Sequence, residues 1–189
     1  WQSNWISPAQ IAFAAKRLNE PITSTLLRFE KFSCIGLDLP YIDLDTLGNF
    51  EATEEDFIML SKGNIGDRTA WAERQISVAQ IVQASWRLKE PLDEILKRLQ
   101  KFVPLGLSIP EVDIDVVKNI SVTRSDSILF SETNDSDYLS RRSPWMDDVV
   151  GPSHLITGVI KLNASVTDIL HQFQKFAPLG LKIQTMDLD

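Results

Sequence analysis

The sequence predicts a mainly α fold built from tandem helix-turn-helix-like repeats with short extended segments. One stretch occurs three times without a gap, at residues 6–45, 76–115 and 150–189. The copies begin 70 residues apart (76−6=70) and then 74 residues apart (150−76=74). Apolar residues recur at helical spacing within each copy, and proline and glycine interrupt them at matching places. Self-similarity of this kind is the signature of a repeat architecture, in which each copy is one structural unit.

Each copy opens with a signal for the start of a helix. Ser7–Gln10 and Ser77–Gln80 have the S-x-x-Q form of a capping box, in which serine and glutamine satisfy backbone amides reciprocally. The third copy carries Gly151–His154 instead, a weaker version. The residues that follow place an apolar stripe at i, i+3, i+4 and i+7, with small residues at its centre that allow close helix packing. In the first copy these are Ile11, Ala14, Ala15 and Leu18.

Proline then separates the first helix of each full copy from a second one. Pro21 and Pro91 cannot continue the preceding helix, but they are well suited to begin the next. A glycine follows each second helix, and we expect it in the left-handed conformation that ends helices, with the next leucine folded back. These glycines are Gly36, Gly106 and Gly180. Alternating residues in 37–40 and 42–45 predict a short extended rim.

A third element and a linker complete each full copy. We predict a helix over Thr53–Ser61, because Thr53 suits an N-cap and acidic residues follow it. The counterpart, Thr123–Ser131, is compatible with a helix or a strand, and we favour a helix. Polar linkers at 62–70 and 132–144 lead to Trp71 and Trp145, which we expect to pack at the joints between copies.

These boundaries divide the chain into four parts. Residues 1–5 are the predicted end of a preceding linker, 6–75 form repeat 1, 76–149 form repeat 2, and 150–189 form the first half of repeat 3. Because Trp1 precedes its copy as Trp71 and Trp145 precede theirs, we expect the chain to be a segment of a longer protein.

Composition restricts the classes of partner. The net charge of −7 and the pI near 4.9 argue against a general binder of nucleic acid or anionic membranes. The sequence has no apolar run long enough to span a bilayer and no signal-peptide pattern. Cys34 is the single cysteine, so an internal disulfide is excluded; this fits a reducing compartment, and we expect a cytoplasmic protein.

No residue pattern indicates catalysis, a metal or a cofactor, so we expect the segment not to be an enzyme. The acidic pairs that recur after each second helix, such as Asp113 and Asp115, are better explained as turn or cap residues than as a calcium site. His154 and His171 have no histidine equivalents in the other copies, so we interpret them as solvated helix positions. Cys34 aligns with prolines, which indicates a filler at a helix end rather than a nucleophile.

Two binding hypotheses remain. A nucleic-acid-binding array would use a basic stripe on the second helices, made of Arg28, Lys31, Lys97, Arg98, Lys101 and Lys175. Neighbouring acids and the acidic chain favour a solvated face instead. A protein-interaction surface would use Phe13, Trp86 and Ile160, at first-helix positions whose residue type changes between copies. We predict that these three face outward, where they pack one copy on the next or bind a partner.

The repeated motifs resemble those of tandem winged-helix repeats in large multidomain bacterial proteins, many attributed to conflict or antiphage systems. The resemblance is carried by the S-P-A-Q start, R-L-x-E-P, F-x-x-x-G-L, the T-x-x-D-x-x-x-L-S element, and the tryptophan before the next copy. It implies an adaptor or sensor module beside separate enzymatic domains. We therefore expect a non-enzymatic scaffold or interaction segment of an intracellular bacterial protein, possessing no cofactor, whose partner is a protein or another domain of the same chain. The nucleic-acid array is the alternative.

Overall fold

The computed structural model describes residues 5–40, 42, 47, 50–61, 71, 74–131 and 148–185. The chain divides into two compact units. Unit 1 comprises Trp1–Ile76 and Leu96–Ile109, and unit 2 comprises Ser77–Ile95 and Pro110–Asp189. Each unit draws its helices from two neighbouring copies of the sequence repeat. The repeat boundaries inferred from the sequence describe its periodicity, and their role as domain boundaries stays a prediction.

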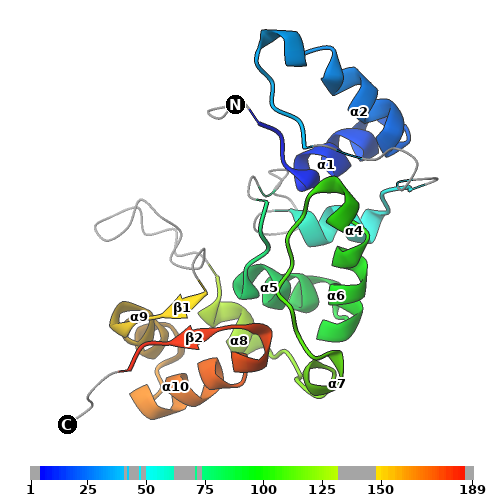
Figure 1. Ribbon diagram of the computed structural model, residues 1–189. Helices are drawn as coiled ribbons and strands as arrows, with labels where there is room; N and C mark the ends of the chain where they lie inside the picture. The colour runs from blue at the N-terminus through cyan, green and yellow to red at the C-terminus, as the bar shows by residue number, and fades with distance from the viewer. Residues whose placement is uncertain are drawn as a thin grey trace. The chain divides into compact units, whose positions relative to one another are not determined.

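The two helices predicted at the start of each copy are present in all three (Figure 1). In copies 1 and 2, Gln10 and Gln80 complete the predicted capping boxes with Ser7 and Ser77. In copy 3, only the return bond exists, from the Gly151 amide to the His154 Nδ1 atom at 2.9 Å, because glycine has no side chain to accept the other. The pairs are α1 (Pro8–Leu18) with α2 (Ile22–Glu30), α5 (Val78–Leu88) with α6 (Leu92–Gln100), and α9 (Pro152–Leu162) with α10 (Val166–Gln174).

Each pair ends in a short 3-10 turn closed by a glycine, as predicted. Gly36, Gly106 and Gly180 have φ values of 93°, 87° and 98°. In copy 1 the Leu37 amide donates to the Phe32 carbonyl at 3.2 Å, so the chain folds back as expected. The three turns are η1 (Ser33–Ile35), η2 (Val103–Leu105) and η3 (Ala177–Leu179).

The residues after each glycine are extended and pair in parallel with the residues that precede the copy's first helix. The pairing is Trp5 with Asp38 and Gln75 with Ser108 in the first two copies. In the third copy it becomes a sheet of β1 (Val149–Val150) and β2 (Lys182–Ile183), in the register Val149 to Lys182. The extended rim predicted at 37–40 is thus confirmed.

The predicted extension over 42–45 falls largely outside the described residues, and its second-copy counterpart is helical. There Asp113 becomes the N-cap of α7 (Ile114–Val117), and its carboxylate accepts the Asp115 amide at 2.9 Å. The side chain thus satisfies a free amide at the start of a helix, which favours a turn over a strand. The cap role predicted for these aspartates is confirmed at Asp113.

The third element is a helix in both full copies, which confirms the prediction for Thr53–Ser61 and decides the alternative at Thr123–Ser131. We call α4 (Glu54–Leu60) and α8 (Arg124–Leu129) the capped helices. Each begins with a complete Thr-x-x-Asp capping box, in which the threonine side chain accepts the aspartate amide and the aspartate side chain accepts the threonine amide. The pKa of Glu55 in the first turn of α4 is lowered, chiefly by a backbone hydrogen bond and next by the Thr53 hydroxyl.

The capped helices pack between helix pairs within their units. In unit 1, α4 packs on α1, and the rings of Phe57 and Phe13 stack with centroids 4.2 Å apart. In unit 2, α8 packs on both α5 and α9. Gly158 of α9 makes this approach possible, because a Cβ atom there would lie only 2.8 Å from Leu129 and 2.7 Å from Ile169. The close packing predicted from small residues at this position is confirmed.

The tryptophan joint is described only in part. The carbonyl of Trp71 accepts the Ser7 hydroxyl at 2.6 Å, and its amide donates to the Leu60 carbonyl at 3.2 Å. The backbone at Trp71, which precedes the second copy, is therefore bonded to the start of α1 and to the end of α4, both in the first copy. Trp1, Trp145 and the linkers 62–70 and 132–144 lie outside the described residues, so the packing predicted for the tryptophans stays a prediction.

Candidate protein-interaction site

A buried carboxylate links each capped helix to the helix pair that follows it. Asp56 is fully buried, and its Oδ2 atom accepts from the Thr53 amide at 2.9 Å and from the Lys101 ammonium at 2.8 Å. In unit 2, Asp126 is likewise fully buried and accepts from Lys175 at 2.5 Å. The recurring lysine of the second helix thus serves a carboxylate inside the fold. We call these contacts the cap–lysine pairs.

Aromatic rings cover both cap–lysine pairs. In unit 1, Phe50 meets Phe102 edge to face at 5.2 Å. In unit 2, Phe130 meets Phe176 edge to face at 5.2 Å and Phe173 at 5.5 Å. Charge-assisted hydrogen bonds are stronger in such surroundings, because little water competes for the charges.

The other cations of the predicted basic stripe have different surroundings. Arg28 pairs with Glu20, with 2.9 Å between Nε and Oε1. Lys31 is exposed, and its ammonium has no ion partner within the described ranges. Lys97 is exposed and Arg98 half-buried, and both make contacts of their own. The stripe as described therefore offers fewer uncommitted cations than its sequence indicates.

Phe13 does not face outward, and the prediction that it does is wrong. Its side chain is only 5% exposed and stacks on Phe57 of α4. The face of α1 opposite the first apolar stripe is covered because the capped helix packs there. The periodicity of one helix could not reveal a second buried face, since the covering element lies more than thirty residues further along the chain.

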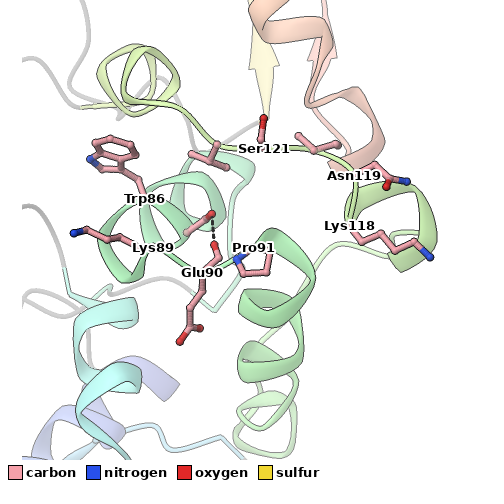
Figure 2. A pocket seen from close by; sticks show the side chains of 10 residues that line it. Trp86, Lys89, Glu90, Pro91, Lys118, Asn119 and Ser121 are labelled. Carbon is pink, nitrogen blue, oxygen red and sulfur yellow. Dashed lines mark hydrogen bonds between the residues drawn. The ribbon is translucent and has the colours of Figure 1, made fainter.

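Trp86 is exposed, as predicted, and lies at the edge of a groove of about 400 Å³. The groove lies within unit 2, between the break that joins α5 to α6 and the segment that joins α7 to α8. Figure 2 shows Trp86 and Lys89 on one side and Lys118 and Asn119 on the other. Its lining residues are Ser85, Trp86, Lys89, Glu90, Pro91, Lys118, Asn119, Ile120, Ser121 and Val122.

The sequence fixes both walls of the groove locally. On the helix side, Lys89 adopts a left-handed conformation (φ 56°) that ends α5, and the Ser85 hydroxyl donates to the Glu90 carbonyl at 2.6 Å (Figure 2). On the other side, Lys118 pairs with Asp115 of α7 at 2.6 Å. The groove thus combines a half-exposed indole with apolar atoms, the acidic Glu90 and two cationic side chains, of which Lys118 is already paired. Such a surface can take a peptide segment that carries an apolar side chain and a carboxylate.

The repeat equivalents of Trp86 occur in different settings. Ile160 is 75% exposed on α9, as predicted, and Ile156 one turn earlier is 60% exposed. Lys16 in the first copy pairs with Glu54 at 3.2 Å. The outward position is therefore confirmed for Trp86 and Ile160, while their role in binding stays a prediction.

The other residues singled out by sequence have structural surroundings. His154 is half-buried at the start of α9, so the prediction of a solvated position is wrong there, because its ring replaces the glutamine of the capping box. His171 is exposed, as predicted. Cys34 is exposed, and its thiol donates to the Lys31 carbonyl at 3.3 Å. Among the described residues, no group of three or more His, Cys, Asp or Glu side chains is placed to hold a metal ion.

Sequence reasoning missed the two buried carboxylates, although the signal for them was present. Thr53-x-x-Asp56 recurs as Thr123-x-x-Asp126, and a lysine recurs at one position of the second helix. The sequence alone does not join the two recurrences, because no local rule links residues about 45 positions apart. An acidic residue and a basic residue that each recur in every full repeat can therefore indicate an ion pair between two elements.

Lys161 of α9 makes a further contact with a capped helix. Its ammonium donates to the Ser131 carbonyl at 2.8 Å and to the Ile128 carbonyl at 3.3 Å, at the C-terminal end of α8. A cation at this end is favoured by the helix dipole. Burial lowers the pKa of Lys161.

The fold and these contacts define an array of short helix pairs joined by capped helices. Residues 51–107 match the model of a winged helix-turn-helix family described as wHTH-Hsp90_Na associated. The matched segment begins just before α4 and ends at the leucine after η2, so it holds one capped helix and the helix pair that follows. It is a winged-helix segment, as the sequence motifs indicated.

No curated protein and no solved structure matches the chain. Within the described part of the chain, no helix is both long and apolar enough to cross a bilayer.

Proposed function

We propose that this segment is a non-enzymatic protein-interaction scaffold, and that the Trp86 groove is its docking site. The exposed indole at the edge of a groove carries this proposal. Tryptophan dominates the binding energy of many interfaces, because it offers a large rigid surface with a polar edge. A tryptophan needed only for stability would be expected inside the core, as Phe13 is.

The lining residues indicate the chemistry of the partner. Lys89 lies on the same side of the groove as the indole (Figure 2), so a partner segment with an apolar side chain beside an acidic one complements this side. The chain as a whole is acidic, with a net charge of −7, so Lys89 offers a cation to a partner that the overall charge would repel. We expect this contrast to give selectivity.

The matched family supports a place beside other domains. Its description associates the winged helix-turn-helix segment with Hsp90_Na. We propose that the array belongs to a larger intracellular bacterial protein, with a role in a defence system, and connects other domains of that protein to a partner or stimulus. The groove partner is then a protein, either a separate one or another domain of the same chain.

A pull-down from the native cell lysate tests the proposal. The chain is immobilised as wild type and as Trp86→Ser, and recovery is compared with and without nuclease, at two salt concentrations. We expect a protein partner that resists nuclease and whose affinity falls by at least about 30-fold in Trp86→Ser, the loss typical of an interface hot spot of about 2 kcal/mol.

Two matched variants control this experiment. Ile160→Ser removes an exposed apolar residue at the equivalent position of another copy, and we expect it to retain the groove partner. Phe13→Ser removes a core ring, and we expect it to lower the melting temperature and helix content as Trp86→Ser does not. If Trp86→Ser loses helix content as much as Phe13→Ser does, Trp86 is a core residue and the proposal fails.

A further inference from the structure

The end of the first helix pair is exposed at positions whose equivalents are buried in the other two copies. Phe102 and Phe176, at the ends of the second and third pairs, are fully buried, whereas their equivalent Phe32 is 51% exposed. Leu105 and Leu179 are also fully buried, whereas their equivalent Ile35 is 78% exposed.

The polar part of this face is open as well. Lys101 and Lys175 each donate to a buried aspartate of a capped helix, at 2.8 Å and 2.5 Å. Lys31 occupies the same position in the first copy, is exposed, and has no ion partner in the described ranges. We call Lys31, Phe32 and Ile35 the open face.

We infer that the open face binds a capped helix of the Thr-x-x-Asp type. The two covered copies define the occupant. It begins with a threonine N-cap, its third helical residue is an aspartate that accepts from Lys31, and an aromatic residue near it meets Phe32. Against Phe102 of copy 2 that aromatic is Phe50, which precedes its capped helix, and against Phe176 of copy 3 it is Phe130, which follows its capped helix.

This occupant fits the open face better than a general apolar ligand does. An exposed apolar patch alone specifies no partner, but a lysine beside it at the ion-pair position requires an acidic group at one defined place. The capping box supplies that group in a fixed orientation, because the threonine amide already holds the aspartate at 2.9 Å in Asp56 and 2.7 Å in Asp126. The open face is separate from the Trp86 groove, so either can fail without the other.

The test uses a peptide of residues Phe50–Ser61, the α4 segment, added in trans to the full chain. Binding is followed by the chemical shifts of the protein amides up to millimolar peptide, because an isolated short helix is only partly formed in water. We expect saturable shifts around Lys31 and Phe32, and at least a tenfold loss of affinity with Lys31→Glu. The peptide variant Asp56→Asn should lose as much, while Lys182→Glu, the same charge change at an exposed site of unit 2, should change affinity less than twofold.

A tethered version removes the dependence on weak affinity. A second copy of residues 50–70 is placed directly before Trp1, which reproduces the spacing by which residues 50–70 precede Trp71. We expect the melting temperature to rise, and the rise to vanish with Lys31→Glu.

Several outcomes would overturn the inference. One is the absence of both peptide binding and tethered stabilisation, and another is binding that Lys31→Glu leaves unchanged. A third is self-association on sedimentation that Phe32→Ser abolishes and the peptide does not affect, which would assign the face to a second copy of this chain.

Discussion

At the scale of single residues, one lysine position has two different roles in the same chain. Lys101 and Lys175 neutralise buried carboxylates, and their side chains are 36% and 30% exposed. Lys31 has no such partner in the described residues. Sequence equivalence in a repeat therefore does not fix the energetic role of a residue, since the role depends on which element packs against it.

We predict that Lys101→Met lowers the free energy of unfolding by about 2 kcal/mol, because Asp56 is left buried without its counter-charge. The partial exposure of Lys101 admits some water and keeps the loss below that of a fully buried pair. Chemical denaturation measures the change. Lys31→Met is the matched control, and we expect a change within about 0.5 kcal/mol. Equal losses in the two variants would mean that the ion pair contributes nothing specific.

At the scale of elements, the capped helices explain why the first helices tolerate so little volume at one position. No free space is left beside the Cα atom of Gly158 in α9, because Leu129 of α8 and Ile169 of α10 both approach it. The equivalent residues in the other two copies are Ala14 and Ala84.

We predict that Gly158→Ala destabilises the chain by about 1–3 kcal/mol, the usual cost of overpacking a core. Helix propensity alone would give the opposite sign, because alanine is favoured over glycine by about 1 kcal/mol in a helix interior. Thermal denaturation decides between the two effects. Ser153→Ala, at an exposed site of the same helix, supplies the control, and a stabilised Gly158→Ala variant would contradict the packing described here.

At the scale of the whole molecule, charge argues against the nucleic-acid alternative. The chain has a net charge of −7, and at least three of the six cations in the predicted stripe are paired with carboxylates, namely Arg28, Lys101 and Lys175. Phosphate binding needs cations that can replace released counterions. A fold shared with readers of DNA does not supply them.

We predict no measurable binding of the chain to a mixed-sequence DNA duplex at physiological salt. Fluorescence anisotropy of a labelled duplex is the measurement, and repetition at low salt shows whether residual binding is electrostatic. Binding that falls steeply with salt and is lost on charge reversal of Lys31, Arg98 and Lys101 would establish the nucleic-acid array instead.

Much of the fold could be predicted because its signals are local. The capping boxes at Ser7 and Ser77, the breaks at Pro21 and Pro91, and the turns at the three glycines depend on neighbours a few residues away. The burial of Phe13 and the cap–lysine pairs could not be predicted in this way, because they depend on which distant helix packs on a given face. The groove beside Trp86 was missed for the same reason, since its second wall begins about thirty residues later.

The capped helix gives the array a direction. Each one packs on the first helix of the pair before it and supplies a buried aspartate to the lysine of the pair after it, so the two ends of a repeat are chemically different. We therefore expect that one more repeat can be added without changing the contacts between a capped helix and the helix pairs on either side of it. An engineered chain with an added copy of residues 50–119 should therefore fold, provided that the buried aspartate of each capped helix meets the lysine of the next helix pair.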